Sequence, residues 1–286
     1  MAEHSLRAAG RTSHLPPSTR RLLPAVWRDG AWQAGERTVP EEAAVAFTYD
    51  GAAHAVMMAT PADLEDFAVG FSVTEGIVGG ADEIESLEMV PLESGIDLRL
   101  WLRADRSAVL AERRRRIAGP VGCGMCGLES LRQVHREIPR VSEGLRVTPD
   151  VIGRALDDLA PAQALHRETR AVHAAAFWQP GAGLLFARED VGRHNALDKL
   201  AGALVRTHTP AGSGIVLLTS RASVELVQKA ATIGAALLVA VSAPTALALR
   251  AAEACGITLV AVARRDGFEV FTHPVRVGGN GPDPWA

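Results

Sequence analysis

One pattern in the second half of the chain constrains its fold more than any other, because short apolar runs there alternate with segments of helical spacing. The apolar runs are 171–177, 183–186, 214–218, 236–241 and 258–262, and the helical segments are 193–204, 223–233 and 245–254. This alternation is typical of a mostly parallel sheet covered by helices. We therefore predict an α/β domain over residues 148–286, which opens with a helix that Asp150 caps.

The first half of the chain predicts a smaller domain of mixed α+β type over residues 23–147. Asp50-Gly51 marks a tight turn between two strands. Thr60 is expected to cap the next helix, with Pro61 in its first turn. Residues 1–22 are rich in Ser, Pro and Arg and are expected to form a disordered tail.

The composition of the chain excludes several classes of function. Of its 286 residues 48% are hydrophobic and 22% charged, as in a globular protein with a buried core. The net charge of -3 gives no general attraction to nucleic acids or acidic membranes, and the 5% aromatic content argues against surfaces that stack on bases. Residues 231–249 are uncharged, but Gly234 and Pro244 interrupt them, so we interpret them as a helix end, a turn and a buried strand. We expect no nucleic-acid or membrane partner.

The cysteines and the N-terminus indicate a cytoplasmic protein. The first residues contain no apolar stretch long enough for a signal peptide. The chain has only three cysteines, Cys123, Cys126 and Cys255, which is too few for a disulfide framework at this length. Cys255 ends an apolar helical segment, and we interpret it as a small buried hydrophobe.

The segment Gly122–Gly127 reads GCGMCG and carries the most reactive side chains of the chain. Cys123 and Cys126 can bring their sulfurs together, and the glycines permit backbone conformations closed to other residues. A structural zinc site needs four ligands, and outside the pair only Cys255 and His135 are candidates.

Two further interpretations of the cysteine pair stand beside zinc, namely a redox disulfide and a persulfide carrier. A carrier needs a thiol of lowered pKa, and the cationic run Arg113–Arg116 is the nearest group that could provide it. An ordinary solvated helix face is the favoured interpretation of that run. The residues of this segment alone leave all three interpretations open.

Two segments place polar and cationic residues where a strand is expected to meet a helix, at 189–199 and 219–223. The candidate ligand-binding residues are Arg193, His194 and Asn195 in the first, and Ser220 and Arg221 in the second. Helix N-termini bind anions, and open α/β sheets bind ligands beyond the carboxyl ends of their strands. We predict that both segments lie at this edge of the sheet and bind phosphate groups there.

Several stretches in a fixed order, covering nearly the whole chain after the tail, resemble the formate dehydrogenase accessory sulfurtransferases, the FdhD family. They are TPADLED (60–66), CGMCG (123–127), HAAA (173–176), EDVGRHNALDK (189–199), SRAS (220–223) and SAPT (242–245). A single CxxC pair would be weak support, but the ordered set is highly specific. The chain departs from the family at Val121-Gly122, where small residues such as serine often precede the first cysteine.

The resemblance implies a sulfurtransferase in which Cys123 carries a persulfide and Cys126 assists. It implies a cysteine desulfurase as sulfur donor and formate dehydrogenase as the enzyme served. The acceptor would be the molybdenum cofactor in its bis-molybdopterin guanine dinucleotide form, bound only transiently, with no permanent cofactor and no metal. The resemblance also implies a homodimer whose larger domain has a cytidine-deaminase-like fold.

The resemblance further implies a cofactor-binding stretch near the C-terminus, made of Val262, Ala263, Arg264, Arg265, Asp266 and Gly267. A guanine nucleotide is expected to mimic the cofactor there. The last four of these residues would also make an ordinary hairpin turn.

His173 completes the expected cofactor-binding set, although a packed core histidine explains it equally well. Zinc deaminases need a glutamate two residues after this histidine and a later P-C-x-x-C motif. Here Ala174-Ala175 follow, so deaminase chemistry is excluded whatever the fold. Arg170-Ala171 stand where the family commonly has two glycines, which affects the expected geometry near His173.

A second function remains compatible with the same residues. In that alternative the protein is a non-catalytic chaperone that binds the cofactor or apo-formate dehydrogenase, and its cysteines hold zinc or a disulfide. Metal content and sulfur loading distinguish the two.

Overall fold

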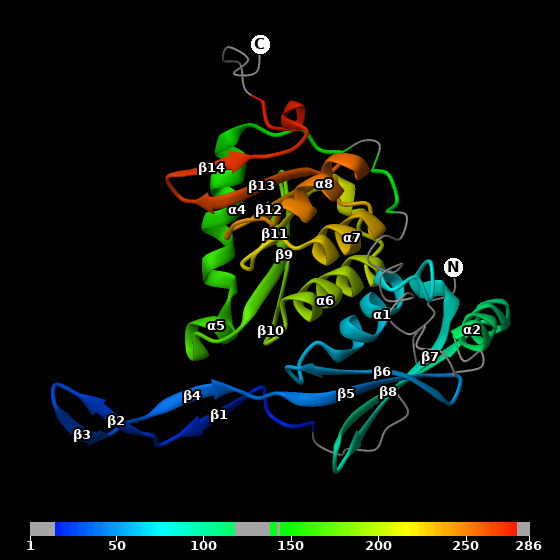
Figure 1. Ribbon diagram of the computed structural model, residues 1–286, viewed down its shortest axis with the longest axis horizontal. Helices are drawn as coiled ribbons and strands as arrows, with labels where there is room; N and C mark the ends of the chain where they lie inside the picture. The colour runs from blue at the N-terminus through cyan, green and yellow to red at the C-terminus, as the bar shows by residue number, and fades with distance from the viewer. Residues whose placement is uncertain (1–14, 118–137, 142–143, 279–286) are drawn as a thin grey trace.

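The computed structural model of the protein describes residues 15–117, 138–141 and 144–278. They form two units, each built on its own sheet, and an arm that projects from the smaller unit (Figure 1). The α/β class expected from the sequence is confirmed. Within these ranges no helix is both long enough and apolar enough to cross a membrane.

The larger unit contains a six-stranded sheet in the order β10-β9-β11-β12-β13-β14. The strands are β9 (His173–Gln179), β10 (Gly183–Asp190), β11 (Ile215–Leu218), β12 (Leu237–Ala240), β13 (Thr258–Arg264) and β14 (Gly267–Val270). Only β11, β12 and β13 run parallel to one another. The expectation of a mostly parallel sheet is therefore wrong for the other three strands. The loops after β9 and β13 are too short for a crossover, so these strands return as antiparallel hairpins.

Helices cover both faces of this sheet (Figure 1). They are α4 (Pro149–Ala162), α5 (Ala164–Thr169), α6 (Arg193–Arg206), α7 (Val224–Thr232) and α8 (Ala246–Cys255). Alternate residues of β11 face the two hydrophobic cores on opposite sides of the sheet. Val216 packs in the core with α6, α7 and α8, whereas Leu217 packs in the core with α4. Thr148, and not Asp150, occupies the N-cap of α4.

The smaller unit is a four-stranded sheet in the order β6-β5-β8-β7, covered by helix α1. Its elements are β5 (Ala43–Tyr49), β6 (Ala52–Ala59), α1 (Leu64–Thr74), β7 (Ile84–Leu92), β8 (Gly95–Leu102) and α2 (Ala104–Ile117). The predicted turn at Asp50-Gly51 is confirmed, and both residues have positive φ as a type I′ turn requires. The predicted cap at Thr60 is wrong: α1 starts later, and Asp63 is its N-cap.

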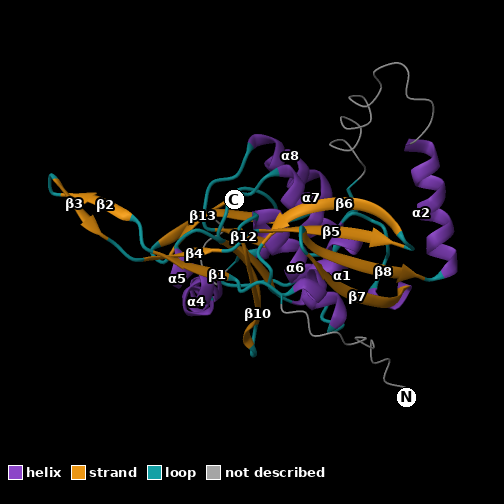
Figure 2. Cartoon of the chain, turned by 90° about the horizontal axis from the view of Figure 1, so that it is seen from below, coloured by secondary structure: helices purple, strands orange, loops and turns teal. Residues whose placement is uncertain are grey.

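The arm is a ribbon of two short antiparallel pairs that extends away from α2 in both views (Figures 1 and 2). Strand β1 (Thr19–Leu22) pairs with β4 (Arg37–Pro40), and β2 (Ala25–Arg28) pairs with β3 (Ala31–Ala34). The predicted disordered tail is therefore wrong for Thr19–Leu22, whose backbone is satisfied by β4. Residues 1–14 lie outside the described part of the chain.

The two units meet where α1 crosses α6. A Cβ atom on Gly70 would lie 1.7 Å from the carbonyl oxygen of Asp198, and one on Gly202 would lie 1.8 Å from that of Asp66. Only glycine permits so close an approach of two helix backbones. Residues before 148 already belong to the larger unit, since the Val141 amide donates to Cys255 O at 2.7 Å and Val147 pairs with Val277.

Candidate functional site at the carboxyl edge of the large sheet

The three parallel strands end at one edge of the large sheet, called here the carboxyl edge. It comprises residues 219–223, 241–245 and 262–264, together with the start of β9 and of α6. Backbone hydrogen bonds join these segments: Val241 N donates to Leu218 O at 2.8 Å, and Val262 N donates to Ser242 O at 3.3 Å. The edge is thus a continuous surface of strand-to-helix loops, the usual ligand position in open α/β sheets.

Side chains and backbone connect the rest of the edge. Thr219 Oγ1 accepts the Ala174 amide at 2.8 Å, beside the start of β9. Ala222 pairs with Pro244, so the loop after β11 lies against the loop after β12. Residues 241–245 were not among the predicted site residues. The strand-to-helix rule that identified 219–223 applies to them equally and would have found them.

Helix α6 begins at the carboxyl edge with Gly192 as its N-cap. The amide groups of a first helical turn have no intrahelical acceptor, and the helix dipole makes this end positive. Arg193 is the first residue of the helix, and its Nε is buried with no hydrogen-bond partner among the described residues. A buried charged donor without an acceptor is costly, so the start of α6 is suited to receive an anion.

Two neutral histidines flank Arg193. Burial, and then the charge of Arg193, lowers the pKa of both His173 and His194. His194 Nε2 lies 3.0 Å from Glu225 Oε2 and 3.5 Å from Ser223 Oγ. A carboxylate acceptor assigns the proton to Nε2, which leaves a lone pair on Nδ1. The positive charge at this end of the edge is therefore concentrated on Arg193.

Asn195 was predicted to bind the cofactor, but the structure turns its side chain inward. Its Nδ2 donates to Met58 O at 2.8 Å and to Asp190 Oδ1 at 2.9 Å. Asp190 Oδ2 also accepts the Thr60 amide at 2.9 Å, and Lys199 Nζ donates to Thr60 O at 2.9 Å. Thr60, Asp190, Asn195 and Lys199 form a buried cluster, called here the inter-unit clamp, that holds the start of α6 against the smaller unit.

A second buried cluster lies around Asp198 of α6, next to the inter-unit clamp in sequence. Lys229 Nζ contacts Asp198 Oδ1 at 2.9 Å and Glu75 Oε1 at 2.7 Å, and Thr74 Oγ1 donates to Asp198 at 2.6 Å. Burial alone would lower the pKa of Lys229, but the two carboxylates outweigh it and the pKa is raised. Together the two clusters fix the orientation of α6 from both units.

The other residues predicted in the loop after β11 take different positions. Ser220 is buried and its Oγ donates to Arg221 O at 3.1 Å. Arg221 is exposed at the edge. Arg221 therefore adds a solvent-facing cation to the surface that begins at Arg193.

The predicted C-terminal stretch divides between the edge and a turn. Val262 and Ala263 lie in β13, while Arg265 and Asp266 form the turn to β14, with Arg264 paired to Gly267. A guanidinium nitrogen of Arg264 donates to the carbonyls of Val241 and Ala263. The side chain of Arg265 is 87% exposed and lies 3.4 Å from Asp157 on α4. Arg264 thus lies at the carboxyl edge, as expected for one interpretation of the stretch. Arg265 and Asp266 form the hairpin turn that the other interpretation expected.

Cys123 and Cys126 lie outside the described residues, as do the side chains of Arg113–Arg116. The buried thiol of Cys255 packs in the core beside α8, and burial raises its pKa. The interpretation of Cys255 as a small core residue is confirmed.

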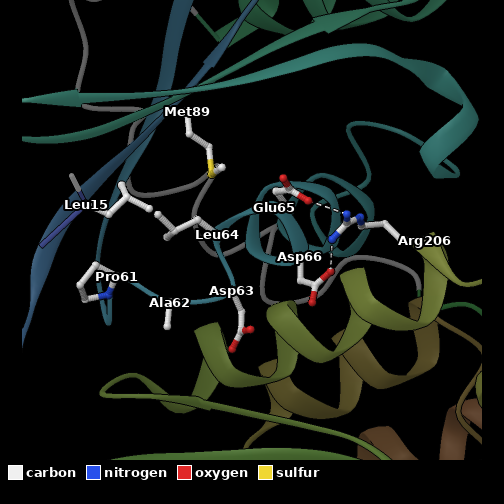
Figure 3. A pocket seen from close by; sticks show the side chains of 9 residues that line it. All are labelled: Leu15, Pro61, Ala62, Asp63, Leu64, Glu65, Asp66, Met89 and Arg206. Atoms are coloured by element: carbon white, nitrogen blue, oxygen red, sulfur yellow. Dashed lines mark hydrogen bonds and ion pairs between the residues drawn. The ribbon is translucent and has the colours of Figure 1, made fainter. Parts of the chain in front are cut away.

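A shallow pocket of about 300 Å³ lies elsewhere, at the start of α1 (Figure 3). Its lining is Leu15, Pro61, Ala62, Asp63, Leu64, Glu65, Asp66, Met89 and Arg206. Arg206 bridges Glu65 and Asp66, and Arg188 donates to Asp66 at 2.8 Å. These ion pairs join α1 to the larger unit. Across the part of the chain that the structure describes, no group of three or more His, Cys, Asp or Glu is arranged to hold a metal ion.

Comparison with known proteins gives one consistent result. The model of the FdhD/NarQ family matches residues 40–278. "Sulfur carrier protein FdhD" of Agrobacterium fabrum is 53% identical over 91% of this chain and 96% of its own, and that of Cupriavidus necator is 47% identical over 92% and 91%. A crystal structure described as a formate dehydrogenase accessory protein from Desulfotalea psychrophila superposes with a TM-score of 0.71 at 25% identity. It covers 91% of this chain and 100% of that one.

Proposed function

Because the chain belongs to the FdhD/NarQ family, we propose that it is a sulfur carrier in the maturation of formate dehydrogenase. It takes sulfur from a cysteine desulfurase and delivers it to the molybdenum cofactor in its bis-molybdopterin guanine dinucleotide form. The relatives that bear the name sulfur carrier protein match over nine tenths of the chain, which supports the same role here. We further propose that the protein acts in the cytoplasm as a homodimer.

The sulfur step needs only a reactive thiolate and no external oxidant. The thiolate of Cys123 attacks the outer sulfur of the persulfide on the desulfurase. The sulfur–sulfur bond of that persulfide breaks, and the cysteine thiolate of the desulfurase leaves with the electron pair. Cys123 then holds the persulfide, and Cys126 assists its release to the acceptor. The CGMCG sequence supplies both thiols three positions apart in the chain.

The acceptor cofactor carries two guanine nucleotides with their diphosphates, so a binding site must supply cations and free donors. The observation that carries the proposal is the buried Nε of Arg193 at the start of α6, which has no hydrogen-bond partner in the part of the chain that the structure describes. A phosphate oxygen there would satisfy a donor that is otherwise unsatisfied, in a position where a helix N-terminus already favours anions. Arg221 and Arg264 extend the same surface along the loops.

The neutral state of His173 and His194 fits this role. A neutral imidazole offers one donor and one acceptor, as recognition of a purine base or a pterin requires. Burial, and then the charge of Arg193, lowers the pKa of both rings, which favours this neutral form. The residues of the edge thus fit a phosphorylated heterocycle better than a free inorganic anion.

Intact-mass measurement of the protein after incubation with a cysteine desulfurase and cysteine tests the carrier function. We expect the mass of one added sulfur, removed by cyanide and absent from Cys123→Ala. Cys255→Ala is the matched control, because it removes a thiol that is buried in the core, and it should load as the wild type does. A gain that persists when Cys123 and Cys126 are both alanine would overturn the proposal, and stoichiometric zinc lost with either cysteine would favour the chaperone alternative.

A further inference from the structure

The arm ends in a hairpin that has one entirely apolar face. Strands β2 and β3 pair Ala25 with Ala34 and Trp27 with Trp32, so these four side chains share a face, called here the tip pad. The two indole rings meet edge to face, with their centroids 5.3 Å apart. The turn at Asp29-Gly30 has positive φ at both residues, as a type I′ turn requires, which gives the tip a defined shape.

The tip pad is uncovered in the single chain. Trp27 is 59% exposed and Trp32 is 70% exposed, although tryptophan is among the side chains that gain most from burial. An isolated two-stranded ribbon is at best marginally stable in water, and a contiguous apolar patch on a surface marks an interaction site. The arm is therefore suited to pack against another surface.

The smaller unit has a second apolar surface, on the face of its sheet opposite α1. Helix α1 packs on the face that carries Val45. The alternate residues Ala44 and Ala46 of β5 face the other way, as do their partners on β6, Met58 and Val56. These last four residues, called here the sheet pad, include no charged side chain, and Val56 is 63% and Met58 51% exposed.

One chain cannot bring its own two pads together. Strand β4 leads through residues 41–42 directly into β5, and the arm continues the direction of β5 away from the rest of the chain in both views (Figures 1 and 2). The extended segment from Ala34 to Ala43 spans about 30 Å. Arg20 pairs with Glu41 at 2.9 Å and β4 packs against α5, so the base of the arm is held in this direction.

We propose that the tip pad of each copy docks on the sheet pad of a second copy of the chain, in a two-fold dimer. The inference rests on the homodimer of the proposed function and assigns its interface. The two reciprocal contacts close the assembly, because they leave no pad of either copy free.

The charges of the arm favour a second copy over a partner of opposite charge. Neither pad contains a charged residue, and two arginines of the arm are paired within it, Arg20 with Glu41 and Arg21 with Glu36. The cores of homodimer interfaces are apolar in this way, whereas association steered by charge needs a surface of one sign.

The area of the two pads is sufficient for a stable dimer. A tryptophan side chain can bury about 150–250 Å². At the exposed fractions of Trp27, Trp32, Val56 and Met58, one contact removes about 500 Å² from water through these side chains alone. The two contacts of a dimer together remove about 1,000 Å², which reaches the size of a specific interface before the rest of the arm is counted.

Sedimentation velocity of the full-length protein measures the dimer directly. We expect the wild type to be dimeric at micromolar concentration. The double variant Trp27→Ser with Trp32→Ser, and separately Val56→Glu, should each raise the Kd of the dimer at least tenfold. Val275→Glu is the matched control, because Val275 of the larger unit is 62% exposed and lies in neither pad, and it should dimerise as the wild type does. Circular dichroism and sulfur loading report that each variant folds, as expected for changes at exposed side chains.

Mixing the two variants tests the exchange itself. A heterodimer of the tip variant with Val56→Glu retains one intact contact, between the tip pad of the second chain and the sheet pad of the first. We therefore expect the mixture to form dimers at a concentration where neither variant does so alone. Dimerisation of Val56→Glu with the Kd of the wild type would show that the sheet pad is not the docking surface, and would overturn the exchange.

The outcomes separate this inference from the function on which it rests. A wild-type dimer that none of the pad variants weakens would overturn the interface alone. A wild-type protein that is monomeric but loads sulfur would overturn both the interface and the proposed homodimer, and would leave the carrier function in place. A dimer that the pad variants dissociate, but that never loads sulfur, would support the interface and refute the carrier function.

Discussion

Lys199 Nζ lies 2.7 Å from Asp190 Oδ2, and both side chains are completely buried. Burial lowers the pKa of Lys199, although the charge of Asp190 acts in the opposite direction. Backbone groups of Thr60 in the smaller unit complete the hydrogen bonds of the pair and stabilise both charges. Asp190 ends β10 and Lys199 lies two turns into α6. The pair therefore fixes the start of α6, where the proposed phosphate site lies, to the smaller unit.

Replacing one member of this pair should be much worse than replacing both. Lys199→Met leaves Asp190 buried without a counter-charge, and we expect a loss of about 3–5 kcal/mol in the free energy of unfolding. The double variant with Asp190→Asn should lose less than the sum of the single variants, with a coupling energy of about 1–3 kcal/mol in urea titrations. Strictly additive losses would show that the two charges do not stabilise each other.

The crossing of α1 and α6 should not tolerate a methyl group. Gly70→Ala places a Cβ 1.7 Å from Asp198 O and must separate the helices, at an expected cost of about 2–3 kcal/mol or more. Gly153→Ala is the matched control, because nothing lies within 4 Å of its added Cβ in the middle of α4. That variant should gain about 1 kcal/mol from helix propensity. Equal effects of the two changes in thermal unfolding would contradict the close crossing.

Stability should fall in mild acid because of the two histidines at the carboxyl edge. The pKa values of His173 and His194 in the folded protein lie below the ordinary 6.5. As the pH falls, these two side chains therefore bind protons in the unfolded chain before they do so in the folded protein. The stability they contribute is complete above pH 6.5 and is lost as the pH falls through the lowered folded values. Urea titrations from pH 7 to 5 should show a smaller loss in His194→Gln and the smallest in the double variant with His173→Gln. Identical slopes in all three proteins would contradict the burial of these rings.

Arg193 and Arg206 lie at opposite ends of α6 and should behave in opposite ways. Arg193→Ala removes a buried donor that has no partner among the described residues, so it should raise the Kd for guanosine diphosphate at least tenfold without lowering the free energy of unfolding. Arg206→Ala breaks the ion pairs to Glu65 and Asp66 and should cost about 1–3 kcal/mol with unchanged nucleotide binding. If Arg193→Ala destabilised the protein and bound the nucleotide normally, its role would be structural.

The position of the candidate site could be predicted from the sequence, because it follows from a simple rule of topology. Polar residues placed between a strand and a helix, as at Arg193 and Arg221, come to the carboxyl ends of parallel strands. The rule did not predict that the side chain of Asn195 turns inward to Met58 and Asp190 and away from the edge. A signal was available: Asn195, Asp198 and Lys199 have the i, i+3, i+4 spacing of one helix face, and that face is buried against the smaller unit.

Other features could not have been predicted from local sequence. Valine strongly prefers extended backbone, so nothing around Val262 signals a left-handed residue, which only the tertiary contacts impose. The antiparallel direction of β9 and β10 is different, because the short Pro180-Gly181-Ala182 connection between two apolar runs is itself a hairpin signal that the expectation of a mostly parallel sheet did not use. The close crossing of Gly70 and Gly202 joins segments more than a hundred residues apart, and neither glycine shows its partner in its own neighbourhood.

Transfer of labelled sulfur tests the central claim most directly. The protein is loaded with radioactive sulfur by a cysteine desulfurase, mixed with bis-molybdopterin guanine dinucleotide cofactor and apo-formate dehydrogenase, and the label on the cofactor is measured. The account predicts label on the cofactor from wild type, none from Cys123→Ala, which does not load, and little from Arg193→Ala, which loads normally but binds the acceptor weakly. Equal transfer from Arg193→Ala and wild type would contradict the role of the carboxyl edge, and no transfer from fully loaded wild type would contradict the sulfur-carrier function itself.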